Sequence, residues 1–195
     1  MDRGVQVLPD RIEREGVLLR RWLVTDAEAL REAVAESADH LRPWMAWMAH
    51  EPQTVEQRRA MLAEREREWS QGGDVMLGIF VGDDVGGSCG LHRRRGPRAL
   101  EIGYWIHSSF TGCGYGTAVA RMLTEAAFSI PEITHVEIHH DKANSASSGV
   151  PRRLGFRLVG ETPDDGAAPA AVGIDRTWRM DRDRWQRDRA RGAHR

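Results

Sequence analysis

The chain has 195 residues and a mass of 21.9 kDa, a length that favours one domain over two. Lys and Arg (28) nearly balance Asp and Glu (29), which excludes the global positive field expected of a protein that binds nucleic acid or an anionic membrane. With two cysteines, no secretory signal and no apolar stretch of 18 residues, the sequence excludes a disulfide framework, a CxxC zinc site and a transmembrane helix, so we expect a cytoplasmic protein without a metal.

The first third of the chain predicts one strand and two helices. Residues 17–23 (VLLRRWL) read as a strand, and the TDAE motif at 25–28 then forms a capping box, in which a hydroxyl and a carboxylate satisfy the first free amides of a helix. The TVEQ motif at 54–57 is a second capping box, and the helix that it opens ends at the glycine pair 72–73. A tryptophan-rich link, 41–48, joins the two helices.

From residue 76 onward the apolar residues follow the period of strands. Two short apolar runs flank Gly82-Asp83-Asp84, which predicts a hairpin. A βαβ unit follows, with a strand at 100–106, an apolar helical face at 117–129 and a strand at 135–140. This order favours an α/β sandwich built on a mixed sheet. A short helix and two late strands complete the fold, at 144–154, 156–159 and 174–180.

We assign residues 1–181 to a single domain. Residues 182–195 contain six Arg and two Asp, and we expect them to form a flexible C-terminal tail rather than a nucleic-acid arm. The loop at 161–173 is rich in Pro, Gly, Ala and Asp, a composition that predicts a mobile segment.

The most informative motif is the glycine loop Gly112-Cys-Gly-Tyr-Gly116. Alternate glycines let a ligand approach the backbone, and their amides precede a predicted helix, whose positive N-terminus suits phosphate. The alternative is a turn that only packs the helix on a strand. A Walker loop is excluded because no Lys follows Gly116. A dinucleotide oxidoreductase stays open as a minor reading, because Asp141 stands where a Rossmann ribose-binding acid would, although Thr117 replaces the third glycine.

Three sequence motifs, taken together, resemble those of a known family. EIGYWI and GCGYGTA are followed about 28 residues later by an NxxSxxVxxxLGF pattern that runs from Asn144 to Phe156. In this order they resemble the GNAT superfamily of N-acetyltransferases, in particular the branch that contains the ribosomal-protein-alanine N-acetyltransferases. The resemblance covers about residues 17–181 and implies a mixed, mostly antiparallel central sheet flanked by helices.

The resemblance also implies the ligand. Acetyl-CoA would be the co-substrate, with no metal, and its pantetheine would pair with the strand that ends at Trp105, Ile106 and His107. Thr111 carries no charge where the family usually has Arg or Gln, so Arg93, Arg94, Arg95 or Arg121 is expected to supply it. The remaining residues expected to bind the co-substrate are Gly112, Cys113, Gly114, Tyr115, Gly116 and Thr117 for the pyrophosphate and Asn144 for the pantetheine arm.

Candidate residues for the chemistry follow from the same resemblance. Glu101 is the expected base for the acceptor amine, the alternative being a solvated strand charge. Ser147 is expected to hydrogen-bond the leaving sulfur, the alternative being a helix-cap serine, and Tyr104 is another candidate acid. Trp44 and Trp47 are expected to line the acceptor pocket, although core or lid packing explains them equally well.

The sequence therefore predicts an N-acetyltransferase that moves acetyl from acetyl-CoA to a primary amine by direct attack in a ternary complex. The acceptor is either a protein N-terminus or a small molecule, and a homodimer is expected. The alternative is a catalytically silent acyl-CoA-binding sensor or subunit. Pro151 keeps this alternative open, because a proline inside the helix that carries Ser147 removes a backbone hydrogen bond.

Overall fold

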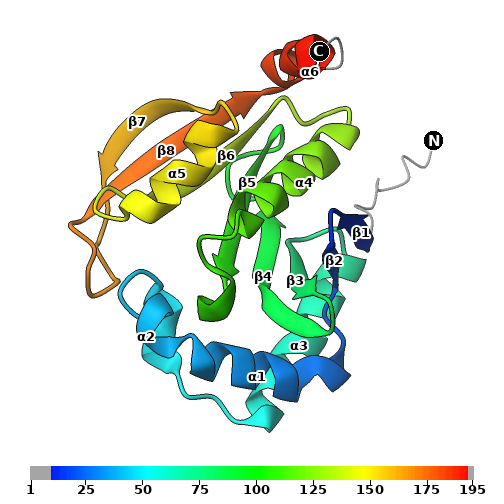
Figure 1. Ribbon diagram of the computed structural model, residues 1–195, viewed down its shortest axis with the longest axis vertical. Helices are drawn as coiled ribbons and strands as arrows, with labels where there is room; N and C mark the ends of the chain where they lie inside the picture. Colours follow the sequence, from blue (N-terminus) through cyan, green and yellow to red (C-terminus); the bar gives the residue numbers. More distant parts are fainter. Residues whose placement is uncertain (1–9, 193–195) are drawn as a thin grey trace.

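The computed structural model describes residues 10–192, which form an eight-stranded sheet with helices on both faces (Figure 1). Neighbouring strands follow the order β1-β2-β3-β4-β5-β6-β8-β7. Every pair is antiparallel except β5 with β6, so the predicted mixed, mostly antiparallel α/β fold is confirmed. The strands are β1 (Arg11–Arg14), β2 (Val17–Arg21), β3 (Val75–Val81), β4 (Asp84–His92), β5 (Ala99–Ile106), β6 (His135–Asp141), β7 (Arg157–Pro163) and β8 (Ile174–Asp181).

Apolar side chains form one core on each face of the sheet. Leu123 of α4 belongs to the first core, and Leu30 of α1 and Leu62 of α3 belong to the second. No described helix is long and apolar enough to span a bilayer. The helices are α1 (Ala27–Glu36), α2 (Ala38–Leu41), α3 (Val55–Ser70), α4 (Tyr115–Ser129), α5 (Ser145–Arg153) and α6 (Arg182–Gly192), with 3-10 turns η1 (Val24–Asp26), η2 (Ala46–His50) and η3 (Ser108–Phe110).

The two parallel strands, β5 and β6, pair over only part of their length. Their register runs from Ala99 opposite His135 to Ile102 opposite Ile138, whereas β5 continues to Ile106. On its other edge β5 stays paired with β4 along this whole stretch. The last four residues of β5 therefore have an edge that no strand of residues 10–192 pairs with.

The two predicted capping boxes have different outcomes. The box at Thr54 is confirmed, because its hydroxyl accepts the Gln57 amide at 3.2 Å and the Gln57 side chain accepts the Thr54 amide at 2.7 Å. The box at Thr25 is wrong, because α1 begins after Asp26. The Asp26 carboxylate accepts the Leu23 amide at 2.8 Å, and this bond makes residues 24–26 a separate 3-10 turn.

Asp141, at the end of β6, fixes one end of the loop between β7 and β8. Its Oδ2 accepts the amides of Val172 and Gly173, each at 3.0 Å, and of Ile174 at 3.2 Å, while Oδ1 accepts the Ala143 amide at 2.8 Å. Burial opposes ionisation, but these amides prevail and lower the pKa of the carboxyl. The carboxylate that the dinucleotide interpretation assigned to a ribose is therefore bound to the protein's own backbone.

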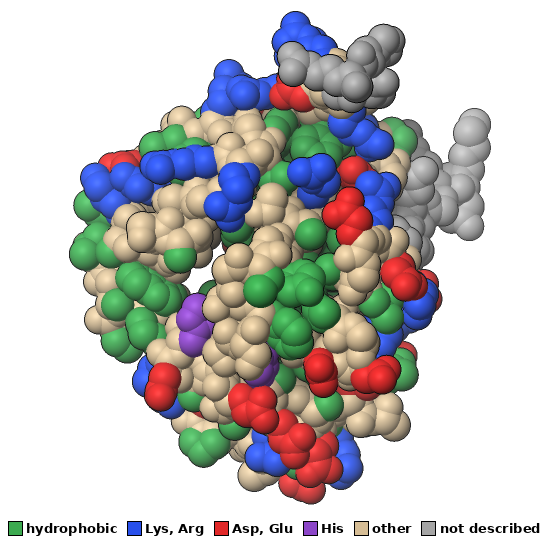
Figure 2. All heavy atoms as spheres, in the orientation of Figure 1, with side chains coloured by type: hydrophobic (Ala, Val, Ile, Leu, Met, Phe, Trp, Pro, Cys, Tyr) green, Lys and Arg blue, Asp and Glu red, His purple; other side chains and the backbone are tan. Residues whose placement is uncertain are grey.

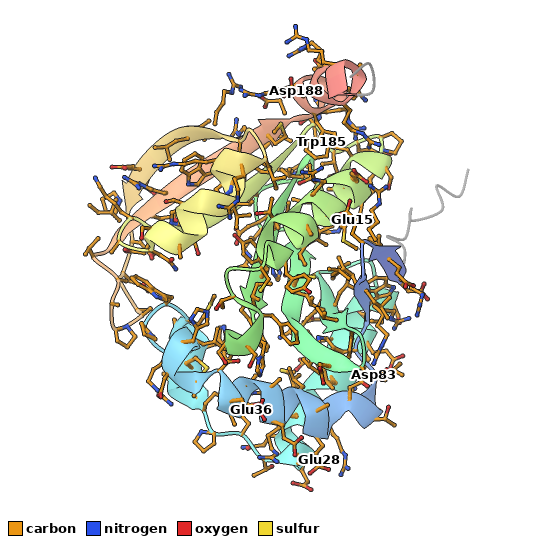
Figure 3. All side chains as sticks on the ribbon, viewed as in Figure 1. Glu15, Glu28, Glu36, Asp83, Trp185 and Asp188 are labelled. Carbon is orange, nitrogen blue, oxygen red and sulfur yellow. The ribbon has the colours of Figure 1, made fainter. Side chains whose placement is uncertain are left out.

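Residues 182–192 differ from the expected flexible tail, because they form α6. Trp185 is buried, and its ring lies 6.4 Å from that of Phe128 at the end of α4 (Figure 3). The Arg182 guanidinium donates to the carbonyl of Phe128 in the last turn of α4, and to those of Ile130 and Ile133 in the segment after it, the last at 2.8 Å. One buried indole and one guanidinium thus hold this segment against the rest of the domain, although its overall composition is that of a solvated tail. Residues 1–9 and 193–195 lie outside the described part of the chain.

Candidate functional site

A cavity of about 500 Å³ lies where β5 leaves β6. Its walls come from the end of β5, the loop before α4, the start of α5 and the segment after α2. Figure 2 shows a hollow between the positions that α5 and α2 occupy in Figure 1. We call it the glycine-loop cavity. It brings together most of the predicted site residues: Trp44, Trp105, Ile106, Gly112, Gly114, Tyr115, Gly116, Thr117, Asn144 and Ser147.

The backbone of the glycine loop is shaped for an anion. Gly112 and Gly114 have φ angles of +77° and +87°, a region that costs other L-residues about 1–2 kcal/mol. Gly114 is the N-cap of α4, and its carbonyl accepts the amides of Thr117 and Ala118 at 3.0 and 3.1 Å. The amides before Thr117 precede the first helical bonds, so they remain available at the positive end of α4. This arrangement fits a phosphate group.

Arg153 supplies a positive charge beside this helix end. It lines the cavity, and its Nε donates to the Thr117 hydroxyl at 3.0 Å. The arginines expected for this role lie elsewhere: Arg94 lines a different cavity, and Arg95 is paired with Glu101. Arg153 was not among the arginines expected from the sequence, although it lies within the NxxSxxVxxxLGF motif.

Asn144 positions the helix that carries Ser147. Its Oδ1 accepts the Ser147 amide at 3.1 Å, so Asn144 is the N-cap of α5. Pro151 lies inside this helix, and because proline has no amide hydrogen, the Ser147 carbonyl lacks the donor that position 151 would otherwise provide. The helix nevertheless forms from Ser145, as the sequence predicted, and it places Ser147 in the cavity wall.

Tyr104 adds an unpaired donor to the same cavity. Its hydroxyl is buried and has no hydrogen-bond partner among the described residues. Burial raises the pKa of this phenol, while the charge of Arg153 opposes the rise. The hydroxyl therefore stays protonated at neutral pH, and a buried donor without a partner fits a ligand that accepts a hydrogen bond.

Two residues expected to bind the ligand have side chains engaged elsewhere. The buried His107 ring lies 3.1 Å from the Glu36 carboxylate and accepts the Ser109 amide at 3.2 Å. Cys113 is exposed, and its thiol lies 3.6 Å from the Thr111 carbonyl. Neither side chain lines the cavity, so contacts through their backbone stay a prediction.

Glu101 is a buried, ion-paired residue rather than a solvated strand charge. It is 8% exposed, and its Oε2 accepts a hydrogen bond from Arg95 Nε at 2.6 Å. The residue opposite it on β6 is Glu137, which Arg179 pairs with at 2.7 Å. Glu101 lines neither of the two cavities described for this site, and its role as a base stays a prediction.

A second cavity, of about 520 Å³, adjoins the first. It is lined by residues of α1, η2, α3, β3, β4 and β5, including Trp47 of η2 and His92 of β4, and we call it the His92 cavity. Met45, Tyr104 and Trp105 line both cavities. The Trp47 ring lies 6.4 Å from the Trp105 ring. The two tryptophans predicted to line the acceptor pocket lie in different cavities: Trp44 lines the first and Trp47 the second.

Comparison with known proteins agrees with this geometry. Residues 17–157 match the acetyltransferase (GNAT) domain family. The chain is 28% identical over 151 residues to a protein of Bacillus subtilis (strain 168) named "Putative ribosomal N-acetyltransferase YdaF", a match that covers 77% of this chain and 82% of that one.

Two solved structures share the fold. One is the ribosomal L7/L12 alpha-N-protein acetyltransferase RimL in complex with coenzyme A, with a TM-score of 0.80 and 21% identity over 92% of this chain and 99% of that chain. The other is the microcin C7 self-immunity acetyltransferase MccE in complex with acetyl-CoA and AMP, with a TM-score of 0.81 and 18% identity over 91% of this chain and 99% of that chain.

A charged network on β6 and β8 borders the site through Glu101. His139 Nδ1 lies 2.7 Å from Asp175, and its Nε2 lies 3.1 Å from Glu137. Burial disfavours the charged imidazole, but the two carboxylates outweigh burial and raise the pKa of His139. Because both ring nitrogens face carboxylates, the imidazolium form can donate a hydrogen bond to each of them.

The network predicts a pH-dependent contribution to stability. Because the pKa of His139 is raised by folding, its contribution is complete below the pKa of the unfolded ring, about 6.5, and is lost as pH rises through the folded pKa. We expect His139→Gln to lower the free energy of unfolding by about 1 kcal/mol at pH 5.5, after screening by solvent, and by less at pH 9. Urea denaturation at both pH values measures this, and a difference that grows with pH would contradict it.

Proposed function

The chain belongs to the GNAT family and is an acetyl-CoA-dependent N-acetyltransferase, and we propose that it transfers acetyl to a primary amine by direct attack in a ternary complex. The observation that carries this proposal is the meeting of three elements in one cavity. The glycine loop, the free edge of β5 and the start of α5 supply, respectively, amides for a phosphate, strand-like hydrogen bonds for an amide chain, and a hydroxyl for a sulfur.

The diphosphate of acetyl-CoA binds, in this proposal, at the N-terminus of α4. The amides from Gly112 to Gly116 donate to it, and the helix dipole favours its negative charge. Arg153 adds a positive charge at the same end of the cavity. Its charge takes the place of the one that Thr111 lacks.

The pantetheine arm pairs with the free edge of β5. Two amides in pantetheine give it the hydrogen-bonding pattern of an extended peptide, so residues 103–106 can accept it as an added strand. Tyr104, whose hydroxyl has no partner among residues 10–192, is a donor for the same arm. This path leads the thioester from the glycine loop toward the residues that line both cavities.

Ser147 hydrogen-bonds the departing sulfur in this proposal. It lies in the first turn of α5 and lines the cavity, and Asn144 holds its amide. A serine hydroxyl is a weak acid, so it stabilises the developing thiolate by donating a hydrogen bond rather than by transferring a proton early. The silent-module alternative gives Ser147 only a capping role.

The acceptor amine approaches from the His92 cavity. This cavity meets the first one at Met45, Tyr104 and Trp105, so an amine within it can reach a thioester held on β5. Trp47 and Trp105 give the junction an apolar wall. Both acceptor classes, a protein N-terminus and a small-molecule amine, remain part of the proposal, as do the cytoplasmic location and the homodimer.

The first prediction concerns turnover. With acetyl-CoA, the protein should release free thiol in the presence of at least one of four amines: a peptide that begins with Ala, a peptide that begins with Ser, tryptamine, and an amino sugar. Initial rates at varied concentrations of both substrates should give intersecting double-reciprocal lines, as a ternary complex requires. Binding of acetyl-CoA without thiol release for any amine would favour the silent module.

The second prediction concerns Arg153. Arg153→Gln should raise the Kd for CoA about tenfold, because a charge-assisted contact to phosphate contributes on the order of 1–2 kcal/mol. Arg152→Gln is the matched control, since Arg152 lies over the Trp178 ring at 5.5 Å and does not line the cavity. Equilibrium dialysis with CoA measures both variants, and equal losses would contradict the assignment.

The third prediction concerns Ser147. Ser147→Ala should lower kcat at least tenfold and change the Kd for acetyl-CoA less than threefold, because the hydroxyl is needed mainly as the thiolate forms. Ser145→Ala is the control, as Ser145 is exposed on the same helix turn. A loss confined to binding of acetyl-CoA would show that Ser147 acts on the ground state instead.

A further inference from the structure

His92 lies at the end of β4, and a neighbouring carboxylate fixes the orientation of its imidazole. The proposed function gives this side chain no role. Its Nδ1 lies 2.7 Å from Asp74 Oδ2, and Asp74 Oδ1 accepts the Arg93 amide at 2.8 Å. Burial opposes ionisation of Asp74, but these two hydrogen bonds prevail and lower the pKa of the carboxyl. Because Asp74 is an anion, it accepts a hydrogen bond from Nδ1–H, which leaves the lone pair of the neutral ring on Nε2.

Two glycines make room for this ring. Gly90 and Gly103 face each other across β4 and β5. A Cβ at Gly103 would lie 3.1 Å from His92 Nε2, and a Cβ at Gly90 would lie 3.3 Å from the same atom. Any larger residue at either position would press on the imidazole, so the sheet itself provides the surface on which the ring rests.

Nε2 is the part of the ring that remains available. No residue among 10–192 forms a hydrogen bond with it, and the His92 side chain lines the His92 cavity and is 23% exposed. A nitrogen with a free lone pair in the wall of an acceptor cavity is placed to accept a proton from an amine.

We propose that His92, positioned by Asp74, is the base that deprotonates the acceptor amine; this inference rests on the proposed function. The ammonium gives one proton to Nε2, and the freed lone pair forms the C–N bond to the thioester carbonyl carbon. The C–S bond then breaks, its electron pair leaves with the sulfur, and the second proton of the nitrogen neutralises the thiolate. The imidazolium releases its proton to water, so the products are the amide, the free thiol and one proton.

Glu101 is less suited to this step than His92. Its Oε2 is occupied by Arg95 at 2.6 Å, its Oε1 lies 3.8 Å from Arg94, and it lines neither cavity. In this proposal Glu101 instead stabilises the charges next to the site. The charged and titratable groups around His92 are Asp74 before β3, Arg94 after β4, Glu101 opposite on β5, Arg58 and Arg65 of α3, and His50 of η2.

The test compares variants with the most reactive of the four amines. His92→Gln should lower kcat/KM at least 100-fold, the ordinary range for loss of a general base, and leave the Kd for acetyl-CoA within twofold. Asp74→Asn should lower kcat/KM about tenfold, since it only positions the ring. His135→Gln is the matched control, because its side chain is 22% exposed against 23% for His92, and it should retain full activity.

The pH profile separates a base from a structural residue. In the wild type, kcat/KM should fall as pH decreases, because a base that is already protonated cannot accept the proton of the amine, and this fall should be absent in His92→Gln. Added imidazole should restore part of the activity of His92→Ala. If His92→Gln keeps kcat/KM within threefold of the wild type, or if imidazole restores nothing to a folded His92→Ala, the inference is overturned while the proposed function stands. A wild type that acetylates none of the amines overturns both.

Discussion

The separation of β5 from β6 after Ile102 is the constraint on which the site depends. Two parallel strands that stayed paired to their ends would satisfy each other's backbone groups and leave no place for a ligand. Here β4 holds the other edge of β5 in register as far as Ile106, so the freed edge stays extended and ordered. In the proposed function the ligand therefore binds in a gap within the sheet, with β4 holding β5 on one side and helix termini on the other.

Charge is divided between the two sides of this gap. On one side the glycine loop and Arg153 make a positive end at α4, where the helix dipole and a guanidinium act on the same ligand group. On the other side, Glu101 and Glu137 are paired with arginines, and a carboxylate orients His92. In the proposed function, the near-zero net charge of the chain is thus the sum of a positive end that binds phosphate and a second end that accepts a proton.

Local patterns predicted what depends on local chemistry. The capping box at Thr54 and the glycine loop before α4 were readable because each is complete within a few residues. The box at Thr25 was wrong because the Asp26 carboxylate binds the Leu23 amide instead, and α6 was missed because a single buried indole, Trp185, outweighs a run of charged neighbours.

Local sequence patterns did not predict the residues whose roles depend on the register of the sheet. Gly90 and Gly103 are thirteen positions apart in sequence and become one surface for His92 only when β4 pairs with β5. Asp74 and His92 likewise meet across a hairpin. The charge of Arg153 could be assigned to the glycine loop only from the packing of α5 against α4. The family pattern predicted most of the residues that line the glycine-loop cavity, and the tertiary contacts revealed the groups around it.

The most direct measurement of the central claim is a crystal structure of the protein with acetyl-CoA. The account predicts diphosphate oxygens about 2.7–3.2 Å from backbone amides between Gly112 and Thr117, with the pantetheine beside residues 103–106 of β5 and the thioester at the junction of the two cavities. A diphosphate bound away from the N-terminus of α4, or a pantetheine that does not follow the free edge of β5, would contradict it.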